Sequence, residues 1–361
     1  MPPDRPTTER SDDALADAAG GDHTDERPSD PRRTIVPTAM AVAVGATALA
    51  MLAREYATYR AERDAAYARV DPTDQRVAAT PVGDVEYRDR GAGTPVLVSH
   101  GIVGGCDQAV QIGRSFVDDA RIVAPSRFGY LGSAIPTYPS PAAQSRAFAG
   151  LLDELGIDDA VVLGTSAGAP AAIRFALAFP ERTRGLVLLA ATTPSDREAP
   201  TGPPTPLLRD PVFWLLHSRA PWLLRRLFGV SRSDWRTAAP TDRDRVDARF
   251  ETLFPVAPRR HGTAIDTDVT TPHVVDHADD YDPADVAAPT LVVHAENDPL
   301  APYEDAARFA ARAPNAALRG YETGGHLVFG HGDDVRDTVT AFANAPADWL
   351  AANADANNPT L

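Results

Sequence analysis

A serine flanked by glycines is the residue in this sequence whose surroundings best suit covalent chemistry. Ser166 lies in the pentapeptide Gly164-Thr165-Ser166-Ala167-Gly168, between a short apolar run (160–163) and a helix-like stretch (167–179). Such a pattern arises by chance in about one chain in ten of this length. A sharp turn from strand to helix, however, leaves room only for glycine or alanine around the serine. We therefore predict a strained serine nucleophile, since a serine that only capped a helix would not need both glycines.

A nucleophilic serine needs a base, and the base needs an acid that orients it. His326 follows Gly324 and Gly325 after the last predicted strand, and these glycines allow a loop to turn the histidine over the sheet edge. Asp298 lies just past another predicted strand, at the end where catalytic groups gather in open α/β sheets. We predict that His326 is the base and Asp298 the orienting acid.

Other residues compete for these two roles. Glu296 and Asp196 also follow predicted strands, and His331 comes five residues after His326. We expect His261, His273 and His277 to be structural or exposed. Cys106 is the one cysteine in the chain, so an intrachain disulfide and a thiolate metal cluster are excluded, and we expect a buried bystander thiol.

Two backbone N–H groups must hold the oxyanion that forms when the serine attacks. One is expected from Ala167, directly after the nucleophile at a helix N-terminus, where the helix dipole favours negative charge. The other is expected from the loop after the predicted strand 95–99, which reads His100-Gly101-Ile102-Val103-Gly104-Gly105.

These motifs, in this order, resemble the α/β-hydrolase fold family. The family carries a His-Gly pair at the position of His100-Gly101, and the resemblance implies that the amide of Ile102 is the second oxyanion donor. Two more stretches match the family, Gly105-Cys106-Asp107-Gln108 and the loop 126–133. The similarity covers roughly Val82 to Ala345 apart from an insertion, and the order Ser, Asp, His is the one expected of this fold.

The resemblance implies a serine hydrolase that needs no cofactor and no metal. Members that act as dehalogenases or epoxide hydrolases use an aspartate at the position of Ser166, so both activities are disfavoured. Hydrolysis of a carboxylic ester of a small to medium apolar substrate, through an acyl-enzyme, is the first hypothesis. Carbon–carbon bond hydrolysis, perhydrolysis and acyl transfer use the same triad and stay open. A non-catalytic, membrane-tethered binding protein on this scaffold is the alternative from another class.

An insertion at residues 192–286 is predicted to form a helical cap. It contains the aromatic-rich stretch DPVFWLLHSRAPWLLRRLFGV and a second helix near 241–253. Some of its apolar residues are expected to attach the cap to the core, and others to line an apolar substrate pocket.

The elements that must position these residues alternate between strands and helices. Strands are predicted at 82–88, 95–99, 120–125, 160–163, 185–191, 290–294 and 317–321, with helices at 141–155, 167–179 and 303–312. Buried apolar strands that alternate with helices indicate an α/β fold with a mostly parallel sheet covered on both faces. The core is expected over 75–191 and 287–353.

The amino-terminal region changes character sharply. Residues 1–33 are rich in Asp, Arg, Pro and Ser and are predicted to be disordered, as is the tail 354–361. Residues 34–53 carry no charge and are long enough to cross a bilayer as one helix, followed by a helical connector at 54–74. A single-pass membrane anchor is the first interpretation. Export through the pair Arg32-Arg33, which resembles a twin-arginine signal, and a buried core helix are the alternatives.

The charge balance limits the partners. The net charge is −15, and all 35 basic residues are arginine. Nucleic acid is excluded as a partner because phosphate binding needs a basic face. An acidic chain without lysine resembles proteins of halophilic organisms, in which salt screens the repulsion. A genome rich in G and C, which encodes arginine in place of lysine, is the alternative.

Overall fold

The computed structural model describes residues 31–71, 73, 75–197 and 202–353, in two compact units, Met1–Tyr56 and Ala57–Leu361. Of the tails predicted to be disordered, residues 1–30 and 354–361 lie outside the described residues; the prediction is wrong for 31–33, which form the first turn of a helix.

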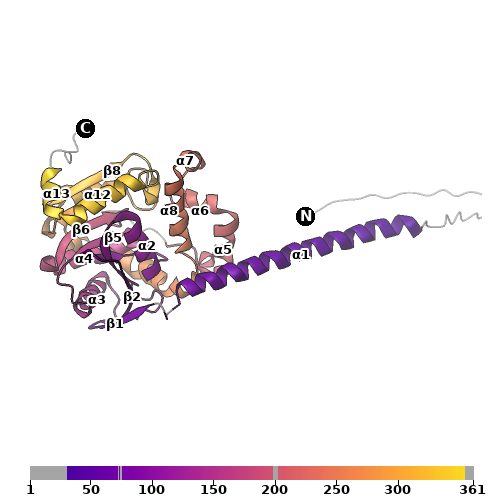
Figure 1. Cartoon of the computed structure of the whole chain (residues 1–361), viewed down its shortest axis with the longest axis horizontal. Helices are drawn as coiled ribbons and strands as arrows, with labels where there is room; N and C mark the ends of the chain where they lie inside the picture. Colours follow the sequence, from indigo (N-terminus) through magenta and orange to yellow (C-terminus); the bar gives the residue numbers. More distant parts are fainter. Residues whose placement is uncertain (1–30, 72, 74, 198–201, 354–361) are drawn as a thin grey trace, which may run out of the picture. The chain divides into compact units, whose positions relative to one another are not determined.

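One long helix, α1 (Pro31–Arg69), includes the predicted anchor and most of the predicted connector, and it ends five residues before the connector was predicted to end at 74 (Figure 1). It begins three residues earlier than the anchor was predicted to begin, and no break separates the apolar segment from the charged one, because neither contains a helix-breaking residue after Pro37 apart from a single glycine. Among the described residues it is the one helix long and apolar enough to be a candidate membrane span, Met40–Arg69, and a signal sequence would meet the same criteria. None of its apolar window is buried inside the protein.

An eight-stranded sheet forms the centre of the second unit, in the order β1-β2-β4-β3-β5-β6-β7-β8. At one edge β2 pairs antiparallel with both β1 and β4, and all the other neighbouring strands are parallel. The strands are β1 Arg76–Thr80, β2 Gly83–Arg90, β3 Thr94–Ser99, β4 Ala120–Pro125, β5 Ala160–Thr165, β6 Thr183–Leu189, β7 Thr290–Ala295 and β8 Ala316–Tyr321. The predicted mostly parallel sheet is confirmed, and β1, which was not predicted, extends its antiparallel edge.

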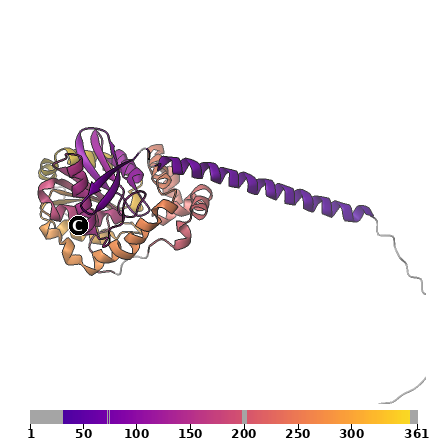
Figure 2. The same ribbon diagram turned by 90° about the horizontal axis from the view of Figure 1, so that it is seen from below.

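Helices cover both faces of the sheet (Figures 1 and 2). Apolar residues of α3 (Pro141–Glu154), α4 (Ala169–Ala178) and α11 (Tyr303–Arg312) form a core on one face. Residues of α2 (Cys106–Phe116) and α12 (Gly332–Asn344) form a core on the other, beside the short α13 (Pro346–Ala352). Neighbouring residues of β5 divide between the two cores, with Val162 in the first and Val161 and Leu163 in the second. This alternation is why the strands read as continuous apolar runs.

The chain between β6 and β7 is helical, and it packs on the core through a third apolar cluster. Its helices are α5 Asp210–Arg219, α6 Pro221–Leu227, α7 Arg232–Thr237, α8 Pro240–Glu251, α9 Arg260–Ile265 and α10 Thr271–Asp276. The predicted second helix near 241–253 corresponds to α8. The cluster joins Phe213, Trp214 and Phe250 of these helices to Val103 and Phe329 of the core.

Candidate active site

Ser166 occupies a tight turn between β5 and α4. Its φ is +50°, a left-handed conformation that a residue with a side chain adopts only at a cost. A Cβ on Gly168 would lie 2.3 Å from the carbonyl oxygens of Ser99 and His100, and one on Gly164 would lie 2.7 Å from the Cβ of Ala172. Both glycines are therefore required by close backbone packing. The predicted strand–turn–helix geometry is confirmed, and the helix begins after a 3₁₀ turn at Ser166–Gly168 rather than at Ala167.

His326 and Asp298 are brought together by the loops after β8 and β7. The Nδ1 of His326 lies 2.8 Å from Oδ2 and 3.1 Å from Oδ1 of Asp298. Because Nδ1 faces a carboxylate, the proton belongs on Nδ1, and Nε2 is left to accept a proton from another group. This is the arrangement that a general base requires.

Asp298 is a fully enclosed carboxylate with several donors around it. Its Oδ1 accepts hydrogen bonds from the N–H groups of Leu300 and Ala301, at 2.8 and 3.0 Å. The Nε2 of His294 lies 3.2 Å from Oδ2. Burial acts to raise the pKa of Asp298, but His326, His294 and the backbone donor outweigh it and hold the pKa well below its usual range. Asp298 is therefore ionised whenever the protein is folded near neutral pH.

The loop that carries His326 is fixed from two sides. The N–H of Gly325 donates to Oδ1 of Asn297 at 2.8 Å, and the N–H of His326 donates to the carbonyl of Phe228 at 2.9 Å. Gly325 has a φ of +58°, and a Cβ there would lie 2.4 Å from that same carbonyl. Sequence reasoning identified the need for glycine, but not Asn297 or Phe228.

The loop after β3 lies against the serine. A Cβ on Gly101 would approach the Cβ of Ser166 to 3.4 Å, so Ile102, the next residue, follows a backbone that touches the predicted nucleophile. The N–H of Gly101 donates to Oε1 of Gln108 at 3.0 Å. Ala167 lies at the start of a helix, where the first N–H groups have no partner within the helix. The loop that carries Ile102 and the turn that carries Ala167 thus both lie against Ser166, and their role as oxyanion donors stays a prediction.

His100 anchors this loop as a neutral imidazole. Its Nε2 accepts the N–H of Arg127 at 2.9 Å, so the ring proton is on Nδ1, 2.8 Å from the carbonyl oxygen of Gly101. Burial lowers the pKa of His100 well below its usual range, and the positive charge of Arg127 acts in the same direction.

Two buried arginines hold the carbonyl groups of the same loop. The guanidinium of Arg127 donates to the carbonyls of His100 and Gly101 at 2.9 and 3.1 Å, and pairs with Asp266 at 2.5 and 2.6 Å. Arg259 donates to the carbonyl of Gly104 at 2.5 Å and pairs with Asp107. Asp266 and Arg259 both belong to the segment between β6 and β7. That segment therefore sets the position of the loop, a role that sequence reasoning missed.

The residues that competed with Asp298 and His326 for the roles of acid and base form no contact with either of them among the described hydrogen bonds and ion pairs. Asp196 has a side chain that is 92% exposed and pairs with Arg308. Glu296 is exposed, and His331 stacks on Tyr321 with 4.2 Å between the ring centroids. Cys106 is fully buried, and burial raises the pKa of its thiol to about 12, so it is inert as expected.

Among the described residues, no hydrogen bond joins Ser166 to His326. His326 and Thr165, the neighbour of Ser166, nevertheless line the same small cavity.

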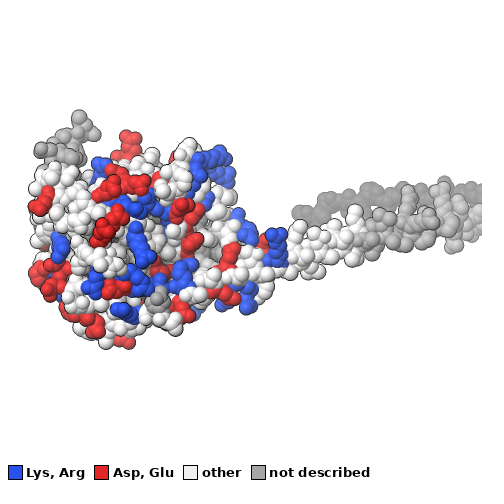
Figure 3. All heavy atoms as spheres, in the orientation of Figure 1, with Lys and Arg blue, Asp and Glu red and all other residues white. Residues whose placement is uncertain are grey.

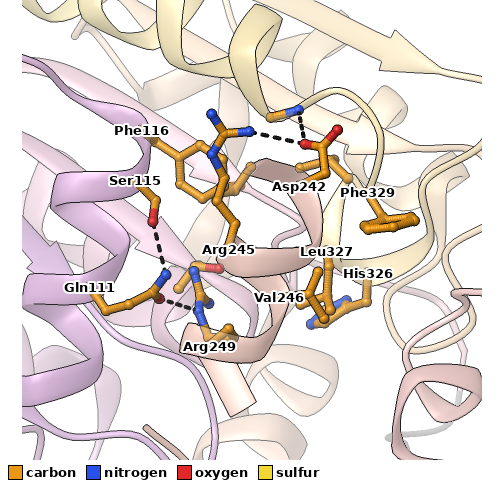
Figure 4. Close-up of a pocket in the computed structure, with 14 residues that line it drawn as sticks. Gln111, Ser115, Phe116, Asp242, Arg245, Val246, Arg249, His326, Leu327 and Phe329 are labelled. Atoms are coloured by element: carbon orange, nitrogen blue, oxygen red, sulfur yellow. Dashed lines mark hydrogen bonds and ion pairs between the residues drawn. The ribbon is translucent and has the colours of Figure 1, made fainter. Parts of the chain in front are cut away.

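Arg249 of α8 also lines the cavity that holds His326 (Figure 4). Its Nε donates to Oε1 of Gln111 at 2.6 Å, and no carboxylate of the described residues lies within 4.0 Å of it. Burial lowers the pKa of Arg249 to about 10. Nor do the described residues contain a cluster of three or more His, Cys, Asp or Glu that could hold a metal ion.

Two bacterial hydrolases of known sequence are similar to this chain. An uncharacterized hydrolase of Bacillus subtilis, YcgS, is 36% identical over 135 residues, which are 36% of this chain and 47% of that protein, so the match spans about half of its length. The 2-hydroxy-6-oxo-2,4-heptadienoate hydrolase of Pseudomonas putida is 26% identical over 258 residues, 68% of this chain and 87% of that protein.

Solved structures share the fold. An α/β-hydrolase fold protein from Nakamurella multipartita has a TM-score of 0.61 at 26% identity, covering 75% of this chain and 99% of that one. A thermophilic esterase from Thermogutta terrifontis has a TM-score of 0.54 at 22% identity, covering 74% of this chain and 97% of that one, which shows the fold alone. The sequence also matches, over residues 94–333, the family described as alpha/beta hydrolase fold. The strand order, the turn at Ser166 and this match show that the chain belongs to the α/β-hydrolase fold family.

Proposed function

We propose that this hydrolase cleaves a carboxylic ester with Ser166 as the nucleophile, His326 as the base and Asp298 as the orienting acid. The observation that carries the proposal is the 2.8 Å contact between His326 Nδ1 and the enclosed Asp298 carboxylate, in a chain whose serine occupies a strained, glycine-flanked turn. A structural histidine would not need an ionised, fully enclosed partner at the same edge of the sheet as such a serine.

The reaction runs in two halves. The Oγ of Ser166 attacks the ester carbonyl carbon as its proton passes to Nε2 of His326, and the amides of Ile102 and Ala167 hold the oxyanion. The alcohol leaves with the proton from Nε2, which gives the acyl-enzyme. His326 then takes a proton from water, the hydroxide attacks the acyl carbon, and Ser166 recovers its proton from His326 as the carboxylic acid departs.

The segment 192–286 acts as a cap in this proposal. Phe228 at its centre contacts the His326 loop, with 5.9 Å between the two rings, and Asp266 and Arg259 hold the oxyanion loop. The apolar cluster that joins Phe213 and Phe250 to Val103 favours an apolar acyl or alcohol group.

A series of p-nitrophenyl esters of increasing acyl length tests the reaction. We expect burst kinetics, in which the first turnover releases p-nitrophenol faster than the steady state, with preference for medium chains. Absence of ester hydrolysis at every length would contradict the proposal.

Carbon–carbon bond hydrolysis is the second candidate, and Arg249 is the specific observation that favours it. A half-buried arginine without a carboxylate partner, in the same cavity as His326, is suited to a substrate that carries its own carboxylate. The relative from Pseudomonas putida is a hydrolase of a dienoate, which has such a group. Cleavage of a dienoate ketone faster than any ester would favour this candidate over the first.

We also propose that α1 tethers the enzyme to a membrane, with the span at about residues 34–53. The large apolar side chains of its described part are exposed, Met40, Leu49 and Leu52 each by more than 60%. Flotation of the full chain with lipid vesicles, compared with a chain that lacks residues 1–53, tests the tether. A cleaved twin-arginine signal predicts instead that the mature protein begins after the apolar segment.

Adaptation to high salt is proposed from the charge of −15 and the absence of lysine. We expect the midpoint of thermal unfolding to rise as KCl is added beyond the concentrations that screen ordinary surface charges, because acidic repulsion destabilises the folded state. A midpoint that is highest in low salt would contradict this.

A further inference from the structure

The exposed apolar residues of the catalytic unit are concentrated on two consecutive helices. Beyond Tyr56, nine large apolar side chains of the described residues are exposed, and five of them belong to α5 and α6: Val212, Leu215, Trp222, Leu223 and Leu227. Val212 and Leu215 are three residues apart on α5, and Leu223 and Leu227 are four apart on α6, so each pair lies on one side of its helix. We call these five residues and the arginines around them the α5–α6 surface.

This surface is basic in an acidic protein. Residues 209–232 contain five arginines and one acidic residue, Asp210, whereas the whole chain has a net charge of −15. Asp210 is buried and bonded to Tyr67 and to the backbone of the insertion, so it adds no exposed negative charge. Arg209, Arg219, Arg226 and Arg232 are exposed, and blue atoms lie over α6 and α7 in Figure 3.

The arginines and the aromatic residues are interleaved. The guanidinium of Arg232 lies 4.2 Å from the centre of the Trp222 ring, and that of Arg219 lies 4.9 Å from the centre of the Trp214 ring. Exposed tryptophan and leucine next to arginine is the composition of helices that lie in the interface of a bilayer with anionic headgroups. A nucleic acid would not need the exposed leucines, and a surface that only faces water would need neither feature.

The chain itself keeps this surface close to the proposed membrane span. Trp214 of α5 packs edge-on against Tyr59, and its Nε1 donates to Oε2 of Glu62 at 2.6 Å. Tyr59 comes seven positions after Leu52, the last large apolar residue of the predicted span, and seven residues of chain reach at most about 25 Å. This short link leaves α5 within reach of the surface of a bilayer that holds the span.

We infer that the α5–α6 surface docks on an anionic lipid bilayer, so that the insertion faces the membrane into which α1 is placed. The inference rests on the proposed tether and adds a second, peripheral contact to it. The helix α6 ends directly before Phe228, whose carbonyl accepts the N–H of His326. Docking therefore places the wall of the active site at the lipid surface and favours lipophilic esters as substrates.

A site-specific fluorophore tests the docking in the full chain. Cys106 is fully buried, so a new surface cysteine can be labelled selectively. Leu215→Cys and Ile135→Cys are a matched pair, because the native side chains are 57% and 50% exposed and Ile135 lies outside the insertion. Each variant is labelled with the environment-sensitive dye NBD and mixed with vesicles of phosphatidylcholine and phosphatidylglycerol.

We expect the dye at position 215 to shift to the blue and to become protected from iodide in protein that floats with the vesicles, whereas the dye at 135 does not change. Arg226→Glu should reduce the shift at 215. If the full chain floats and the dye at 215 does not shift, the docking surface is wrong and the tether stands. If the chain does not float, both are wrong. A shift at 215 without vesicles that grows with protein concentration would show self-association and also contradict the inference.

Discussion

Arg127 and Asp266 form a bidentate ion pair across the boundary between the core and the insertion, with N–O distances of 2.5 and 2.6 Å and side chains that are 5% and 1% exposed. The same guanidinium donates to the carbonyls of His100 and Gly101, which precede the proposed oxyanion donor. The insertion is thus coupled to the catalytic loop through the buried guanidinium of Arg127, whose separation from Asp266 would destabilise the fold.

Asp266→Asn leaves the guanidinium of Arg127 buried without a counter-charge. We expect a loss of about 3–5 kcal/mol in the free energy of unfolding, measured by urea denaturation, with a fall in kcat in the fraction that folds. Asp159→Asn is the control, because its partner Arg184 and Asp159 itself are 39% and 38% exposed. The control should lose at most about 1 kcal/mol. Equal losses in the two variants would contradict the role given to Asp266.

Gly168→Ala tests the crowding around the serine. The new Cβ would lie 2.3 Å from two carbonyl oxygens, so the turn must shift and Ser166 with it. We expect ester hydrolysis to fall by at least about 100-fold, since small displacements of a catalytic group have effects of that size. Gly156→Ala meets no atom within 4 Å, although its φ is +62°. That control should lose about 1–2 kcal/mol of stability and keep its activity per folded molecule.

Asp298→Asn should remove the carboxylate that orients the His326 ring, while the side chain at position 298 keeps nearly the same size and shape. We expect kcat to fall by about 10⁴-fold with KM little changed. Glu296→Gln and Asp196→Asn should have little effect, because neither carboxylate contacts His326. If either of them abolishes activity while Asp298→Asn does not, the acid has been assigned to the wrong residue.

The pH dependence of stability should report the depressed pKa of Asp298. A carboxylate whose folded-state pKa lies below its unfolded value stabilises the protein fully above the unfolded pKa, about 3.9 for aspartate, and loses that contribution as the pH falls through the folded pKa. The difference in unfolding free energy between the wild type and Asp298→Asn should therefore shrink as the pH is lowered below about 4. A difference that stays constant down to acid unfolding would contradict this sign.

Much of this fold could be predicted because the signals are local. The predicted bounds of β4 and α11 are those observed, since an apolar run interrupted only by Arg121 and an amphipathic helix are each visible within a few residues. The strand β1 was missed, because it is short, half-exposed and stabilised by antiparallel pairing with β2. The predicted strand 185–191 is shifted, since Ala190 leaves the strand with a φ of +44°.

The candidate site also contains some residues that the local sequence identifies and others that only the tertiary fold reveals. Ser166, Asp298 and His326 could be proposed from glycine placement and strand ends, and the structure brings the last two into contact. Asp266, Arg259 and Asn297 could not, because each acts on a loop that only the tertiary fold brings to it. For example, 139 residues separate Arg127 from Asp266. A buried pair of that separation leaves no periodicity or spacing in the sequence.

Covalent labelling of Ser166 tests the central proposal most directly. The wild type, Ser166→Ala and Ser195→Ala are each treated with a fluorophosphonate probe in high salt, and the modified peptide is identified by mass spectrometry. Ser195 is a suitable control because it is a partly buried serine after the neighbouring strand β6. We predict that the wild type and Ser195→Ala carry the probe on residue 166 and that Ser166→Ala is not labelled. An unlabelled wild type, or equal labelling of Ser166→Ala, would contradict the assignment of this protein as a serine hydrolase.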